Sequence, residues 1–216
     1  NATYLARELS KMGIDLVSIA VLPDDIQTIA KYVRENHKKV KYFFVSGGIG
    51  GTHDDVTRPA IAKAVGKRLI MHHEFFIILK NFYKHRLNAA RKRMAMIPEG
   101  AKLIIPRKYP QAPGFQVGNI YVFAGIPELM RDMFATVKET IKKIPSYQSV
   151  VPTKHREGDF ADALTKIARG NPNVQIGSYP FFWKKQLGGR IVVKSKNRAS
   201  LLQASRAVRK LLKSLN

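Results

Sequence analysis

Four glycines within five positions, in the stretch Gly47-Gly-Ile-Gly-Gly51, constrain this chain more than any other feature. The preceding residues 40–46 are β-branched and aromatic, which is typical of a buried strand, and residues 57–65 carry apolar side chains at helical spacing. The glycines are therefore expected to form a turn between the carboxyl end of a strand and a helix. In open α/β sheets ligands bind at that edge, because side chains and helix N-termini converge there.

This glycine turn has the properties of a phosphate site. Glycine leaves backbone N–H groups accessible to an anion and tolerates the positive φ angles that such a cradle requires. Asp54 and Asp55 follow closely, and because carboxylates repel a bare phosphate, they indicate a divalent cation such as Mg²⁺ between carboxylate and phosphate. The alternative is a tight turn followed by an aspartate that only caps the helix.

The turn is neither of the two common nucleotide-binding loops. A Rossmann fingerprint counted from Gly48 would need glycine at position 53, which is His53. No Gly-Lys-Ser/Thr follows to make a Walker loop either.

Residues 46–57, Ser-Gly-Gly-Ile-Gly-Gly-Thr-His-Asp-Asp-Val-Thr, resemble the GG-x-G-P-T-x-D-D-[LV]-T signature of the molybdopterin-binding domain family, in its CinA-like branch. That branch also supplies the amino-terminal domain of eukaryotic FAD synthases. The resemblance covers nearly all of residues 1–143, and the later part of the chain looks like the extra module of the FAD synthase branch. Further segments that resemble the family in the same order are Asn1–Leu9, Met94–Ala101, Ala112–Phe115 and Phe123–Met130.

The resemblance implies a three-layer α/β/α domain with a mostly parallel sheet over residues 1–145. Apolar spacing predicts a small carboxyl-terminal α+β module of β-α-β-β-α order over residues 146–216. Gly51 and Ala124 stand where the family usually has proline, so both turns are expected to be looser than the family pattern. The family's first strand, with its glutamate-bearing turn, would precede Asn1 and is expected to be missing here.

Near the amino terminus the pattern predicts a βαβ unit. Residues 16–22 are expected to form a strand, and apolar residues at three- and four-residue spacing from Ile26 to Val33 predict a helix that leads to the strand at 40–46. Such a unit predicts two parallel strands joined by a right-handed crossover.

A second turn, Gly125-Ile-Pro-Glu128, follows a predicted strand at 120–123 and is expected to face the glycine turn at one edge of the sheet. Glu128 would orient the ligand or its metal, or would simply favour the helix dipole. We predict catalytic and metal-binding roles for Asp54 and Asp55. The residues predicted to bind the ligand or its phosphates are Ser46, Gly47, Gly48, Gly50, Gly51, Thr52, Gly125, Pro127 and Glu128.

Members of the resembling family bind molybdopterin, adenylate it or insert molybdenum, and the CinA-like branch resembles metal-dependent pyrophosphatases that act on ADP-ribose or FAD. The resemblance therefore implies a phosphorylated nucleotide or pterin as ligand, with Mg²⁺, Mn²⁺ or Co²⁺ as cofactor, and favours a homo-oligomer. The leading hypothesis is a metal-dependent pyrophosphatase that hydrolyses ADP-ribose or FAD. The alternative is a non-catalytic molybdopterin-binding protein of molybdenum cofactor biosynthesis.

The charge of the chain supports a third hypothesis. Thirty-eight Lys and Arg residues stand against 15 Asp and Glu, a net charge of +23, with much of the excess in residues 80–108 and 184–213. Such density favours a polyanion such as nucleic acid, although it would also steer a nucleotide or pterin phosphate toward its pocket. Aromatic residues 181–183 beside Lys184 and Lys185 could stack a flavin, adenine or base, or could be buried against the neighbouring domain.

The composition indicates a cellular location for the protein and excludes some kinds of site. No apolar run approaches the roughly 20 residues that span a bilayer, and no signal-like segment opens the sequence, so we expect a cytoplasmic protein without a membrane partner. The chain has no cysteine, which excludes disulfides, thiolate nucleophiles and cysteine-based zinc sites.

Overall fold

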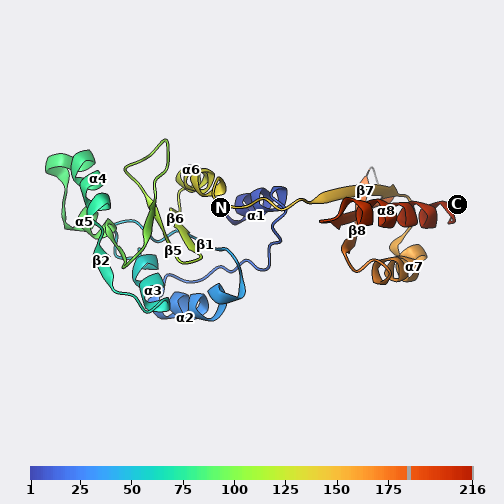
Figure 1. The fold of residues 1–216 in the computed structure, drawn as a ribbon, viewed down its shortest axis with the longest axis horizontal. Helices are drawn as coiled ribbons and strands as arrows, with labels where there is room; N and C mark the ends of the chain where they lie inside the picture. The colour runs from blue at the N-terminus through green and yellow to red at the C-terminus, as the bar shows by residue number, and fades with distance from the viewer. Residues whose placement is uncertain (184–185, 216) are drawn as a thin grey trace. The chain divides into compact units, whose positions relative to one another are not determined.

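The computed structural model describes residues 1–183 and 186–215, which divide into two compact units (Figure 1). The first unit comprises residues 1–6 and 16–142, and the second comprises residues 7–15 and the chain from residue 143 onward. Helix α1 (Ala2–Lys11) contributes residues to each unit.

The first unit contains a four-stranded sheet in the order β1-β6-β5-β4. Strand β1 lies parallel to β6, with Ser46 opposite Phe123, while β5 is antiparallel to both β6 and β4. The sheet is therefore mixed. Its strands are β1 (Phe43–Ser46), β4 (Lys102–Ile104), β5 (Gly114–Val117) and β6 (Ile120–Phe123), and a separate antiparallel pair consists of β2 (Leu69–Met71) and β3 (Met96–Pro98).

Besides α1, the first unit contains α-helices and short 3-10 helices before, between and after these strands. The helices are α2 (Ile26–Asn36), α3 (Thr57–Ala64), α4 (His73–Tyr83), α5 (Ala89–Met94) and α6 (Pro127–Lys138), and the 3-10 turns are η1 (His37–Lys39) and η2 (Lys84–Arg86).

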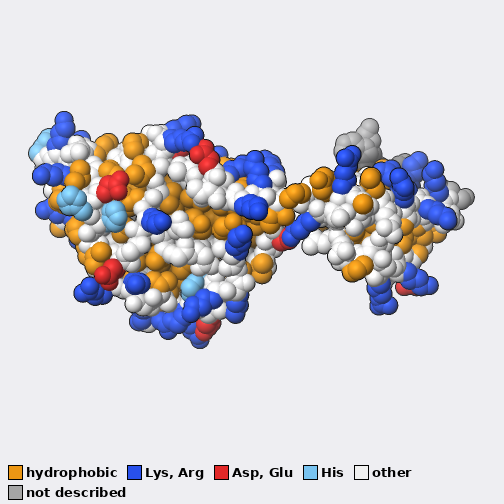
Figure 2. Space-filling view, viewed as in Figure 1, with side chains coloured by type: hydrophobic (Ala, Val, Ile, Leu, Met, Phe, Trp, Pro, Cys, Tyr) orange, Lys and Arg blue, Asp and Glu red, His pale blue; other side chains and the backbone are white. Residues whose placement is uncertain are grey.

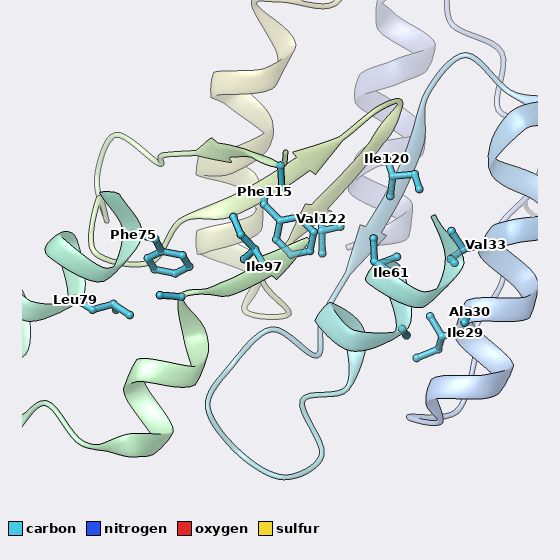
Figure 3. Close-up of a cluster of buried hydrophobic side chains, with 14 residues drawn as sticks. Ile29, Ala30, Val33, Ile61, Phe75, Leu79, Ile97, Phe115, Ile120 and Val122 are labelled. Atoms are coloured by element: carbon cyan, nitrogen blue, oxygen red, sulfur yellow. The ribbon is translucent and has the colours of Figure 1, made fainter. Parts of the chain in front are cut away.

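Helices cover both faces of the main sheet. Figure 3 shows Ile61 of α3 and the apolar face of α2 directed toward Ile120 and Val122 of β6, all within one buried cluster. On the opposite face Phe134 of α6 is fully buried, with its ring 6.4 Å from that of Phe123. Burial of a side chain of this size contributes roughly 1.5–3 kcal/mol. The predicted α/β fold class with three layers is confirmed.

The prediction of a strand at residues 16–22 is wrong. This segment has no regular secondary structure, and Val17, Ile19 and Val21 are 77%, 55% and 94% exposed. Strand β1 pairs with β6 on one side, and within the described residues no strand pairs with residues 16–22. A β-rich sequence forms a strand only when a neighbouring strand satisfies its backbone, so the predicted parallel pair and its crossover do not form here.

The second unit is a three-stranded antiparallel sheet in the order β7-β9-β8, with helices packed on one face. Its elements follow the predicted β-α-β-β-α order. They are β7 (Tyr147–Thr153), α7 (Glu157–Arg169), β8 (Val174–Trp183), β9 (Gln186–Ser195) and α8 (Arg198–Lys213). Val151, Ile191 and Val193 point from the sheet into the core beneath α7 and α8.

Within residues 1–183 and 186–215, no helix is long and apolar enough to cross a membrane. The space-filling view shows many Lys and Arg side chains on each unit and few acidic ones (Figure 2). Lys184 and Lys185, together with the side chains of Phe182 and Trp183, lie outside what the structure describes. The prediction that these residues stack a planar ligand therefore stays a prediction.

Candidate functional site

The two predicted turns lie together at one edge of the main sheet. Because β1 and β6 are parallel neighbours, the chain leaves both strands on the same side. The Gly47 amide donates to the Phe123 carbonyl at 3.0 Å, and a Cβ placed on Gly125 would lie only 3.3 Å from the Gly47 Cα. We call residues 46–56 and 124–128 the paired turns.

Side-chain hydrogen bonds fasten the paired turns to each other. The Ser46 hydroxyl donates to the Ala124 carbonyl at 3.1 Å. The Asn1 amide group donates to the Ser46 hydroxyl at 2.7 Å and to the Gly125 carbonyl at 2.8 Å. Asn1 thus bridges the two turns, a contact that the sequence pattern did not reveal.

The glycine turn bends back onto the start of α3 at Gly48. Its φ angle is +67°, in the left-handed region that favours glycine. The Gly48 carbonyl accepts a hydrogen bond from the Thr57 amide at 3.0 Å, and a Cβ on Gly48 would lie 2.3 Å from the Thr57 hydroxyl oxygen. No other residue fits this turn without displacing the first residue of α3.

Asp55 organises the turn from within. One carboxylate oxygen accepts from the Gly50 amide at 2.7 Å, and the other accepts from the Thr52 amide at 2.9 Å and from the Thr52 hydroxyl. Partial burial raises the pKa of the Asp55 carboxyl, but the hydrogen bonds from Thr52 and Gly50 outweigh it and hold the pKa below its ordinary value. Both oxygens of Asp55 are therefore engaged by the loop itself.

This arrangement predicts a pH-dependent contribution of Asp55 to stability. Because its folded-state pKa lies below the ordinary value of 3.8, the contribution is fully present above that value and is lost as the pH falls through the lower folded-state pKa. Asp55→Asn leaves a loop amide without its acceptor and should cost about 1–2 kcal/mol at neutral pH. The check is thermal melting of both proteins over a pH series, in which the difference should shrink in acid. The same change at the exposed Asp24 is the control, and a gap that is independent of pH would contradict the assignment.

The buried guanidinium of Arg58 hydrogen-bonds to backbone carbonyls of the glycine turn. Arg58, at the second position of α3, is only 5% exposed. It donates to the Ile49 carbonyl at 2.6 Å, to the Met94 carbonyl at 3.2 Å and to the Gly50 carbonyl. Burial lowers the pKa of Arg58 to about 10 although the Asp55 charge opposes this, and the group stays protonated at neutral pH.

Sequence reasoning missed Arg58 as a site residue. Its signal was its place on the buried stripe of α3, three positions before Ile61 and seven before Val65. A charged residue at such a position must find hydrogen-bond acceptors when the helix packs. Here the acceptors are carbonyls of the glycine turn.

Asp54 and Thr52 lie on the exposed side of the turn. The nearby Thr52 hydroxyl and the Asp54 backbone amide lower the pKa of the Asp54 carboxyl below its ordinary value, so this exposed group stays charged at neutral pH. The Gly51 carbonyl accepts from the Arg93 guanidinium of α5 at 3.1 Å. Arg91, Lys92 and Arg93 make this short helix strongly basic, which favours the approach of an anion.

The carboxylates of the paired turns fit a metal ion shared with the phosphates of a ligand better than a metal ion held by protein side chains alone. Within the described part of the chain, no three His, Asp or Glu side chains gather closely enough to hold a metal. Mg²⁺ commonly binds one or two carboxylates and completes its shell with water and substrate phosphates. Asp54 offers one exposed, ionised carboxylate for that purpose, whereas the oxygens of Asp55 already accept hydrogen bonds.

Two helices start at the paired turns without a side-chain cap. Helix α3 follows Val56, and α6 follows Ile126 with Pro127 as its first residue. Glu128 lies exposed in the first turn of α6, where its charge favours the helix dipole. Both helices begin at this edge, where the positive ends of their dipoles favour a bound anion. The Thr57 amide of α3 already donates to the Gly48 carbonyl, and Pro59 and Pro127 have no N–H to offer.

Comparison with known proteins places the chain in a family. Residues 1–143, which include both paired turns, match the description "probable molybdopterin binding domain". The chain belongs to the molybdopterin-binding domain family. In this family member residues 145–215 also match the middle domain of FAD synthase, so the resemblance to the FAD synthase branch is confirmed.

Individual relatives give the same result. This molybdopterin-binding-domain protein is 35% identical over 180 residues to a protein of Archaeoglobus fulgidus, which covers 83% of this chain and 77% of that one. It is 30% identical to a CinA-like protein of Gemmatimonas aurantiaca over 83% of this chain, but it spans only 46% of that relative. The crystal structure of the protein CinA with unknown function from Thermoplasma acidophilum aligns with a TM-score of 0.59 at 26% identity, covering 65% of this chain and 86% of that one. The CinA-like resemblance is thereby confirmed.

Proposed function

We propose that this molybdopterin-binding-domain protein binds a phosphorylated nucleotide or pterin at the paired turns, and that it hydrolyses the pyrophosphate bond of ADP-ribose or FAD. The observation that carries the proposal is that two helices without a side-chain cap, α3 and α6, begin after the adjacent parallel strands β1 and β6. Such an edge attracts phosphate through backbone N–H groups and helix dipoles. The basic helix α5, whose Arg93 contacts the glycine turn, adds a favourable field.

Each side chain at the paired turns has a distinct task in this proposal. Asp54 binds a divalent ion together with the phosphates of the ligand. When bound there, Mg²⁺, Mn²⁺ or Co²⁺ would polarise a phosphoryl oxygen and lower the pKa of a bound water. Asp55 and Arg58 position the turn, because their hydrogen bonds fix its amides and carbonyls. Preorganised N–H groups would then stabilise the negative charge that develops on the phosphate.

The test is release of AMP from ADP-ribose and FAD, each incubated with the whole protein and Mg²⁺, Mn²⁺ or Co²⁺ and followed by chromatography. We expect AMP only when a divalent ion is present and none after addition of a chelator. NAD serves as a third pyrophosphate substrate. If ADP-ribose binds but no metal produces AMP, the hydrolytic part of the proposal fails while the binding part stands.

A second candidate is a non-catalytic molybdopterin-binding protein. It is favoured by the engagement of both Asp55 oxygens within the loop, which leaves Asp54 as the exposed carboxylate of the pair. Calorimetric titration with a phosphorylated pterin separates the two candidates. Affinity that is unchanged by chelator, with no turnover, supports the carrier, whereas affinity that requires the ion supports the pyrophosphatase.

A further inference from the structure

The sheet of the second unit has one face against which neither α7 nor α8 packs. Helices α7 and α8 pack against the face that carries Val151, Ile191 and Val193. Alternation along the strands places other side chains on the opposite face, which we call the open face. Its hollow, of about 240 Å³, is lined by Gln148, Val150, Tyr179, Arg190, Val192 and Lys194.

Two aromatic rings lie against glycines on the open face. A Cβ on Gly177 would meet Tyr179 ring atoms at 3.0–3.3 Å, and a Cβ on Gly188 would meet the Phe181 ring at 3.2 Å. Tyr179 is nevertheless 49% exposed and Phe181 is 44% exposed. Each ring therefore covers a glycine and still presents apolar surface to solvent.

The charged side chains of the described strands β7, β8 and β9 are all positive. The Arg190 guanidinium lies 6.0 Å from the centroid of the Tyr179 ring, and Lys194 lines the same hollow. Strands β7, β8 and β9 contain no Asp or Glu at all. The open face thus combines exposed aromatic rings with cations and lacks carboxylates.

From these contacts we propose that the open face binds single-stranded nucleic acid. Bases stack on exposed aromatic rings whatever their sequence, and cations beside them bind the phosphate backbone. Tyr179 and Phe181 are two residues apart on one strand and hence about 6.6 Å apart, which gives each ring room for its own base. Double-stranded nucleic acid does not offer unstacked bases to such a surface. The proposal does not depend on the chemistry of the paired turns.

A second copy of the chain fits the open face less well. A two-fold symmetric dimer would bring the same patch of both copies together. Arg190 and Lys194 would then face their own counterparts with no acidic residue on either set of strands. Phosphates supply the negative charge that this face lacks.

The test is fluorescence anisotropy of a labelled oligouridylate or oligothymidylate, titrated with the whole protein. An oligonucleotide of roughly 16 nucleotides is used, because that is the upper site size of a single OB fold that binds single strands. We expect binding to the single strand to exceed binding to a duplex of equal length. Y179L/F181L should weaken binding by about tenfold or more, because stacking on each ring is lost. Y179F/F181Y exchanges the two rings and should retain the parental affinity, which separates stacking from folding.

Two double variants that each lose two positive charges distinguish contacts on the open face from the general effect of a basic protein. R190Q/K194Q removes two cations from the open face, and R209Q/K213Q removes two exposed cations from α8, which lies on the other side of the sheet. Only the first should weaken binding markedly at roughly 200 mM salt, where non-specific attraction is reduced. Equal losses in both pairs would overturn the proposal, as would unchanged affinity in Y179L/F181L. The proposal would also fail if sedimentation showed that Y179L/F181L converts a dimer to monomers while its affinity for the oligonucleotide is unaltered.

Discussion

Asp54→Asn should lower the catalytic efficiency of metal-dependent AMP release by about 100-fold or more. The expectation follows from the different surroundings of the two neighbouring aspartates. Asp54 is exposed and ionised, whereas Asp55 is bound to the loop amides. A metal ion at a phosphoryl group contributes several kcal/mol of transition-state stabilisation, and each 1.4 kcal/mol corresponds to about a factor of ten in rate. The amide of asparagine keeps the volume of the side chain but loses the charge.

The measurement is kcat/KM for ADP-ribose across a series of Mg²⁺ and Mn²⁺ concentrations. We expect Asp54→Asn to require more metal as well as to turn over more slowly, since the ion loses a charged ligand. Asp162→Asn, an equivalent change at an exposed residue of α7, should leave both values unchanged. If Asp54→Asn turns over like the parent at every metal concentration, Asp54 does not bind the ion. That result would favour the second candidate, a non-catalytic molybdopterin-binding protein.

The glycine turn could be predicted from the sequence because its signals are local. Strand 43–46, the glycines after it and helix 57–64 each carry their own pattern, and positive φ at Gly47 and Gly48 follows from residue type. The approach of Gly125 to Gly47 could also be predicted, because neighbouring parallel strands end at one edge. Local residue patterns, together with the rule that neighbouring parallel strands end at one edge, were sufficient to predict this part of the fold.

The tasks of individual side chains could not be predicted in the same way. The sequence offered two adjacent aspartates as equivalent metal ligands, but the loop turns the carboxylate of Asp55 inward onto its own amides and leaves Asp54 outside. Arg58 was not predicted as a site residue, because its contacts with the glycine turn depend on how α3 packs. Residues 16–22 had every local property of a strand and failed only because pairing depends on a neighbour.

The open face shows the same limit in the second unit. Alternation along β8 places Tyr179 and Phe181 on one side. Whether this side of the sheet is buried or exposed depends on which face α7 and α8 cover. The pattern of β8 alone does not determine that face. Exposure of these rings is therefore a property of the tertiary structure, and it is the observation on which the proposed nucleic-acid surface rests.

Arg58→Met should destabilise the first unit by about 3–4 kcal/mol. Methionine fills much of the space of the arginine stem but donates no hydrogen bond, so the carbonyls of Ile49, Gly50 and Met94 lose their partner. Each buried polar group that is left unsatisfied costs about 1–3 kcal/mol. The loss of the desolvation cost of the guanidinium, which lowers its pKa to about 10, offsets part of this sum.

Calorimetric melting is the appropriate measurement, because the chain divides into two compact units, which we expect to unfold in separate transitions. A loss of 3–4 kcal/mol should lower the melting temperature of the first unit by roughly 10 °C, while the transition of the second unit stays in place. Arg34→Met is the matched control, since exposed Arg34 makes only one long hydrogen bond, 3.4 Å to the Lys63 carbonyl. If Arg58→Met melts like Arg34→Met, the glycine turn is stable without its guanidinium. Arg58 would then carry no structural role, and Asp55 alone would position the phosphate-binding amides.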